Sequence, residues 1–109
     1  MTVLEQETYD DVNYPAIRLE RDGALVRIVV EEQLTEAVAA AVRELLVDVC
    51  GRRTRSVVLV FEAELGPAGR ELLPRLLDVA QRRCWSGSCR LDVTSSRADV
   101  LELLATTGF

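Results

Sequence analysis

Three cysteines are the side chains of this sequence best suited to redox or metal chemistry. Cys84 and Cys89 enclose Trp85-Ser86-Gly87-Ser88, a segment that could turn and bring the two sulfur atoms within bonding reach, while Cys50 lies well upstream. Zinc sites usually combine CxxC pairs or histidines, and the sequence has neither. We therefore predict no metal site. Two interpretations of the thiols remain open. Cys84 and Cys89 could form a redox-responsive pair, or the cysteines could be small apolar side chains that stay reduced in the cytoplasm.

The sequence lacks the side chains from which most enzymes build a catalytic site. It contains no histidine to act as a general base, and all 13 of its basic residues are arginine. Gly66 and Gly69 do not have the spacing of a phosphate-binding loop, and no lysine follows them. Glutamates near the predicted turns have no supporting catalytic motif and are interpreted as a solvated face; they are Glu31, Glu32, Glu36, Glu62 and Glu64. We predict neither an enzyme nor a bound cofactor.

Length and charge indicate a single acidic domain. The 109 residues suffice for one hydrophobic core, and the net charge of −5 without a basic stripe argues against nucleic acid as a partner. No apolar run approaches the roughly 20 residues of a membrane span, so we expect no membrane insertion. Residues 1–14 are acidic, lack the pattern of a signal peptide, and are predicted to form a loosely ordered extension. A cytoplasmic location is the resulting expectation.

Hydrophobic periodicity over residues 15–109 predicts one α/β domain in the order β-β-α-β-α-β-α, with a central mixed sheet and packed helices. Asp22-Gly23 is typical of a two-residue hairpin turn, and the uninterrupted apolar run 57–61 is typical of a strand covered on both faces. Thr35 is expected to cap the first helix, and Ser96 with Asp99 resembles a capping pair before the last. The predicted strands cover 15–20, 24–30, 57–61 and 89–93, and a loop over 62–69 precedes the second helix.

The order of these elements and three short motifs resemble the STAS family (sulfate transporter and anti-sigma factor antagonist). The motifs are Leu34-Thr35 before the first helix, the turn at the start of the second, and Val100-Leu101-Glu102-Leu103-Leu104 with Thr107-Gly108-Phe109 at the end. The resemblance implies a bacterial regulator of transcription that binds a kinase-like anti-sigma factor. In such proteins, phosphorylation of a serine in the turn breaks the complex, because a dianionic phosphate in an interface is costly to desolvate and repels carboxylates.

This chain departs from the family at that serine. The position falls on Pro67 or, without a gap in the comparison, near Gly69, and no serine, threonine or tyrosine occurs from Val57 to Trp85. Phosphorylation at the usual site is therefore impossible. The resemblance still implies a partner-binding surface, which would comprise Leu34, Thr35, Glu64, Leu65, Gly66, Pro67, Ala68, Gly69 and Arg70.

Three functions remain open from the sequence. The first is a non-catalytic protein-interaction domain of the anti-sigma antagonist type, and the second is a scaffold or accessory subunit of a larger protein assembly. The third is a redox-responsive regulator that uses Cys84 and Cys89. Pairing with a second copy of the chain is also left open. Trp85, the single tryptophan, is interpreted as a cap on the edge of the core, with a partner anchor as the alternative.

Overall fold

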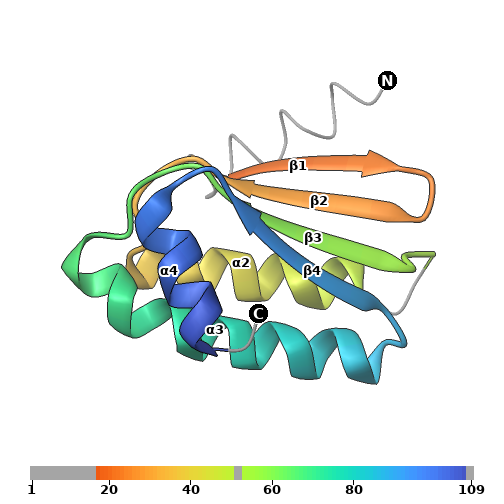
Figure 1. The fold of residues 1–109 in the computed structure, drawn as a ribbon. Coiled ribbons are helices and arrows are strands. Elements are labelled where there is room, and N and C mark those ends of the chain that lie inside the picture. Colours follow the sequence, from red (N-terminus) through yellow and green to blue (C-terminus); the bar gives the residue numbers. More distant parts are fainter. Residues whose placement is uncertain (1–16, 51–52, 108–109) are drawn as a thin grey trace.

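The computed structural model describes residues 17–50 and 53–107, and it confirms the predicted order of elements. The chain folds as β1 (Ile17–Asp22), β2 (Leu25–Val30), α2 (Glu36–Val49), β3 (Ser56–Phe61), α3 (Gly66–Ser86), β4 (Arg90–Ser95) and α4 (Ala98–Thr107) (Figure 1). The extension predicted over residues 1–14 lies outside the described residues. None of the described helices is long and apolar enough to cross a membrane.

The four strands form one mixed sheet in the order β1-β2-β3-β4. β1 and β2 are antiparallel, whereas β2, β3 and β4 run parallel to one another. The hairpin turn lies one residue later than predicted, because Asp22 still pairs with Leu25 and the loop consists of Gly23 and Ala24. Gly23 has a φ of 62°, as a type II′ turn requires at its first loop position.

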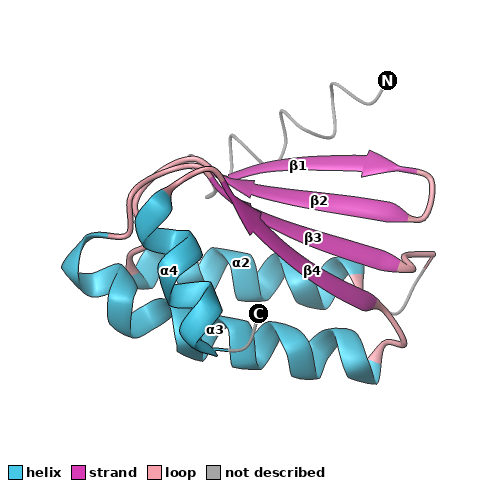
Figure 2. Ribbon diagram, in the orientation of Figure 1, coloured by secondary structure: helices cyan, strands magenta, loops and turns pink. Residues whose placement is uncertain are grey.

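The two faces of the sheet have different surroundings. Along β3, Val57, Leu59 and Phe61 are buried, whereas Val58 and Val60 on the opposite face are only partly buried. Figure 2 shows the helices on one side of the sheet, where α2 and α3 pack against each other. The prediction that this strand is covered on both faces is therefore wrong for the described part of the chain. An unbroken apolar run identifies a central strand but does not reveal what covers its second face.

α3 begins earlier and ends later than the sequence predicted. It starts at Gly66, with Pro67 in the first turn, where a missing backbone N–H breaks no hydrogen bond within the helix. It continues to Ser86, so Trp85 belongs to the helix. The buried residues of α3 follow a helical spacing that includes Ala80 and Cys84, and Trp85 lies off this stripe with 84% of its surface exposed. Its interpretation as a cap on the core is therefore wrong.

Candidate docking surface at the carboxyl ends of the strands

Three connections leave the sheet at the same edge. Val30, Phe61 and Ser95 are paired across β2, β3 and β4, so the segments that follow these parallel strands start side by side. We call residues 31–35 and 62–70 the carboxyl-end surface. In open α/β sheets, ligands bind preferentially outside the carboxyl ends of the strands, so this edge is the natural place to look for a site.

Hydrogen bonds from the β4–α4 connection hold the 62–65 segment in place. The Ser95 hydroxyl donates to the Phe61 carbonyl at 2.5 Å, and Nη2 of Arg97 lies 2.6 Å from Oε1 of Glu64. The backbone N–H of Leu65 donates to Oδ2 of Asp99 at 2.9 Å. This bond is the largest cause that lowers the pKa of Asp99 below its usual value of 3.8, because it favours the ionised carboxylate. The start of α3 is therefore fixed to the start of α4.

Three of the nine residues predicted to bind a partner are buried, although they belong to the segments of the carboxyl-end surface. Leu34 and Leu65 are each 2% exposed, and Gly69 is also buried. A Cβ atom on Gly69 would lie 3.2 Å from Cβ of Leu65 and 3.6 Å from Cβ of Leu34. Such contacts are close for carbon atoms in a packed core. These three residues therefore position the loops and are not accessible to a partner.

The other predicted residues reach the surface. Glu64, Pro67, Ala68 and Arg70 are exposed around the start of α3. Thr35 is exposed as well, and its hydroxyl caps α2 by accepting a bond from the Val38 N–H at 3.2 Å, as predicted.

Gly66 joins the two halves of this surface. It is partly buried, and its φ of +70° is one that residues with a side chain rarely adopt. A Cβ atom there would lie 3.0 Å from Oε1 of Gln33, so the loop after β2 approaches the start of α3 closely. The structure thus brings segments around positions 34 and 67 together, although they are far apart in sequence.

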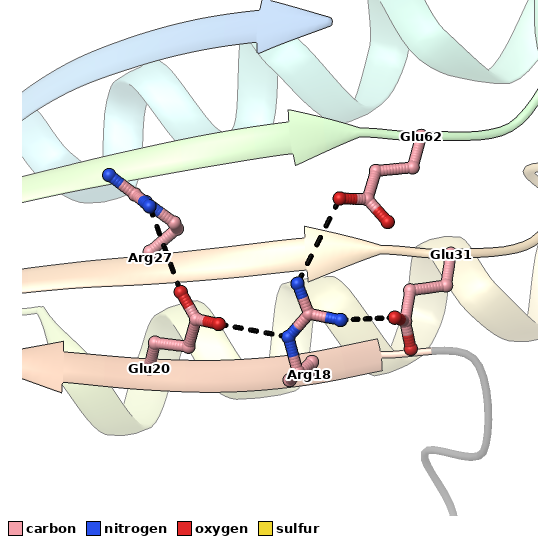
Figure 3. Close-up of polar contacts among 5 residues, drawn as sticks. All are labelled: Arg18, Glu20, Arg27, Glu31 and Glu62. Atoms are coloured by element: carbon pink, nitrogen blue, oxygen red, sulfur yellow. Dashed lines mark hydrogen bonds and ion pairs between the residues drawn. The ribbon is translucent and has the colours of Figure 1, made fainter.

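An arginine lies at the centre of a charged cluster next to the carboxyl-end surface (Figure 3). Nε of Arg18 donates to Glu20 at 2.9 Å, and its other nitrogens pair with Glu31 and, at 3.8 Å, with Glu62. The hydrogen bond to Glu20 is the main cause that raises the pKa of Arg18, and the charges of Glu31 and Glu62 add to it. Arg27 also lies 3.8 Å from Glu20. Two of the five glutamates interpreted as a solvated face are therefore paired with Arg18, and Glu64 is paired with Arg97.

No local pattern in the sequence predicts the long-range pairings of Arg18 with Glu31, of Arg97 with Glu64, or of Asp99 with Leu65. Arg18, Arg97 and Asp99 were not among the predicted site residues, because each contacts a segment remote in sequence. Asp99 was interpreted only as part of a cap with Ser96. In the structure, Ser95 accepts the bond from the Arg97 N–H at 3.0 Å, and Asp99 holds the loop before α3.

The cysteines lie away from the carboxyl-end surface, around the ends of α2 and α3. Sγ of Cys50 and Sγ of Cys84 are 3.6 Å apart. The thiol of Cys89 contacts two backbone carbonyls, those of Thr54 at 3.2 Å and Gly87 at 3.7 Å. The thiol that contacts Cys84 is therefore that of Cys50, whereas the sequence suggested Cys89 as the partner of Cys84. Over residues 17–50 and 53–107, no three histidine, cysteine or acidic side chains are grouped so that they could hold a metal ion.

Comparisons with known proteins show likeness at the level of the fold. No protein-family model matches the chain, and no curated protein sequence matches it. Several solved structures do match, among them a crystal structure of a protein called Mglu, with a TM-score of 0.58 and 25% identity over 77% of this chain and 21% of that chain. A crystal structure of Mglu in its native form matches with a TM-score of 0.58 and 23% identity, over 75% of this chain and 23% of that chain.

A third structure is the L-glutamate-binding form of Mglu in 4.3 M NaCl, with a TM-score of 0.58 and 17% identity over 79% of this chain. The chain spans between 21% and 29% of the length of these Mglu chains. The fold of this small domain is therefore similar to one part of a considerably longer protein.

Proposed function

We propose that this chain is a non-catalytic protein-interaction domain that resembles the STAS anti-sigma factor antagonists and binds its partner through the carboxyl-end surface. The observation that supports the proposal is the meeting of Gln33–Thr35 with Glu64–Arg70 at one edge of the sheet. The two segments that the family resemblance singled out are neighbours in space, and part of each is exposed. The partner we propose is a kinase-like anti-sigma factor in a bacterial cytoplasm, and the outcome is control of transcription.

Burial favours Pro67 as the position that corresponds to the family's serine. Pro67 is exposed in the first turn of α3, where a kinase and a partner could both reach a side chain. Gly69 is buried against Leu65 and Leu34, so a phosphorylated residue could not be accommodated there. Because proline carries no hydroxyl, we propose that the surface binds without the phosphorylation switch and stays permanently in the binding-competent form.

A matched pair of variants tests the proposal against the kinase-like anti-sigma factors of the source organism. Ala68→Glu places a negative charge on the exposed first turn of α3, where a helix N-terminus favours it, so the variant should stay folded. Ala105→Glu makes the same change at an exposed position near the end of α4.

We expect Ala68→Glu to weaken binding at least tenfold, on the order of 1.4 kcal/mol, and Ala105→Glu to leave it unchanged. Failure of the wild-type chain to bind any such factor would overturn the choice of partner. Equal binding by both variants would overturn the choice of surface.

A second candidate is a building block of a larger protein assembly. It is favoured by the likeness to Mglu, in which a region of this fold makes up only about a fifth to under a third of the chain. Size-exclusion chromatography with light scattering on natively purified protein distinguishes the two functions. A large, stable assembly would support the second candidate, and a monomer or homodimer would count against it.

A further inference from the structure

Cys50 and Cys84 lie where two helices end next to each other. Cys50 is the residue that follows α2, and Cys84 lies in the last turn of α3. α2 and α3 follow two parallel strands and pack against each other, so their carboxyl-terminal ends are neighbours. The two sulfur atoms are consequently 3.6 Å apart although the residues are 34 positions apart in the sequence.

The two thiols have different surroundings and different acidity. Cys84 is 1% exposed, whereas Cys50 is only partly buried, so a small molecule in solution reaches Cys50 first. The hydrogen bond between them lowers the pKa of Cys84, because it stabilises the Cys84 thiolate, and it raises the pKa of Cys50. The pair therefore combines an accessible sulfur with a buried and more acidic one.

We propose that Cys50 and Cys84 form an oxidation site at which a hydroperoxide produces a disulfide that links α2 to α3. The Cys84 thiolate, which the hydrogen bond with Cys50 favours, takes the Cys50 proton as the Cys50 sulfur attacks an oxygen of the hydroperoxide. The O–O bond breaks, a sulfenic acid forms on Cys50, and the leaving oxygen takes a proton from solvent to give water or an alcohol. The Cys84 sulfur then attacks the Cys50 sulfur. The S–S bond forms, the S–O bond breaks, and the oxygen leaves as water with the Cys84 proton. Two thiols are oxidised and one hydroperoxide is reduced.

Besides its hydrogen bond to Cys50, which partly offsets the rise in the pKa of Cys50, Cys89 has backbone contacts of its own. Its thiol donates to the Thr54 carbonyl at 3.2 Å. This contact holds the Cys89 sulfur at the segment that leads into β3. Cys89→Ser is therefore the matched control, because it removes a neighbouring thiol and leaves the Cys50–Cys84 pair intact.

Tryptic peptides of the wild type and of single serine variants together distinguish the possible linkages. Cleavage after Arg43, Arg52, Arg83 and Arg90 places Cys50 in one peptide and both Cys84 and Cys89 in another. A disulfide from Cys50 to Cys84 or to Cys89 joins the two peptides, and the variants Cys84→Ser and Cys89→Ser tell these two linkages apart. A Cys84–Cys89 disulfide leaves the peptides separate and removes two hydrogens from the second. The experiment treats the full chain with hydrogen peroxide, blocks the remaining thiols, and maps the peptides by mass spectrometry.

We expect the joined peptides in the wild type and in Cys89→Ser, and their absence in Cys50→Ser and Cys84→Ser. Closing a loop of this length should also raise the melting temperature of the oxidised wild type and of oxidised Cys89→Ser, by roughly 10 °C. Loss of the joined peptides in Cys89→Ser, an internal Cys84–Cys89 linkage, or an unchanged thiol count would each overturn the proposal. The experiment needs no binding partner, so its failure is distinct from a failure of the proposed docking function.

Discussion

Replacing Gly66 with alanine tests whether the backbone at the start of α3 has the conformation described. Gly66 has a φ of +70°, and a residue with a Cβ atom in this left-handed region costs about 1–2 kcal/mol. The new Cβ would also lie 3.0 Å from Oε1 of Gln33, but this is the end of a flexible, exposed side chain that can move aside. We therefore expect the free energy of unfolding to fall by about 1–2 kcal/mol from the backbone and by at most about 0.5 kcal/mol more from the contact.

Gly23→Ala is the matched control for the backbone contribution. Gly23 has a φ of 62°, and nothing lies within 4 Å of the position that its Cβ would take. The difference between the two variants in the loss of free energy of unfolding measures the contact of the new Cβ with Gln33. In a Gln33→Ala background, Gly66→Ala and Gly23→Ala should cost the same. Gly66→Asn should cost less than Gly66→Ala, because asparagine tolerates the left-handed region better.

The assay is urea unfolding followed by far-ultraviolet circular dichroism, since Trp85 is exposed in the folded state and reports poorly on unfolding. If Gly66→Ala is as stable as the wild type, or if Gly66→Asn and Gly66→Ala lose the same stability, the backbone at position 66 does not have the left-handed conformation described.

Three further predictions follow from single contacts or exposures. The hydrogen bond from the Leu65 N–H lowers the pKa of Asp99 in the folded state. The ionised carboxylate therefore stabilises the fold above about pH 4, and this stabilisation is lost as the pH falls through the lowered pKa. Urea titrations of Asp99→Asn should show a weaker loss of stability on acidification than the wild type, and equal slopes would contradict this. Fluorescence of Trp85 should resemble that of free tryptophan and be fully quenched by acrylamide, whereas a protected, blue-shifted emission would contradict the exposure found. With the partner kinase and ATP, Pro67→Ser should be phosphorylated and Gly69→Ser should not, and the reverse result would refute the assignment based on burial.

The order of elements could be predicted from the sequence because each element carries its own local pattern. Ile17 and Leu19 alternate with charged residues, and Thr35 supplies a side chain that caps a helix whatever surrounds it. Turn position and helix length were less predictable. The hairpin loop lies one residue later than the sequence predicts, because the pairing of β1 with β2 continues to Asp22. Helix α3 includes Trp85, because the stripe of buried residues that packs this helix on the core continues to Cys84.

The contacts that build the candidate sites depend on how remote segments pack, which no local pattern reveals. The short spacing of Cys84 and Cys89 in the sequence predicts a pair of these two thiols. In the structure, the Sγ atom of Cys84 lies 3.6 Å from the Sγ atom of Cys50, because α2 and α3 end side by side. Leu65 and Asp99 are likewise joined only because β3 and β4 are adjacent. The sequence pointed to the two segments that form the carboxyl-end surface but not to which of their residues are exposed.

Amide hydrogen exchange of the chain, alone and with the proposed anti-sigma factor, would reveal whether a protein partner binds the carboxyl-end surface. We expect slowed exchange in residues 31–35 and 62–70 on complex formation, and unchanged exchange around Trp85 at the other end of α3. Protection confined to the region of Trp85, or to the strands that carry the cluster around Arg18, would contradict this expectation.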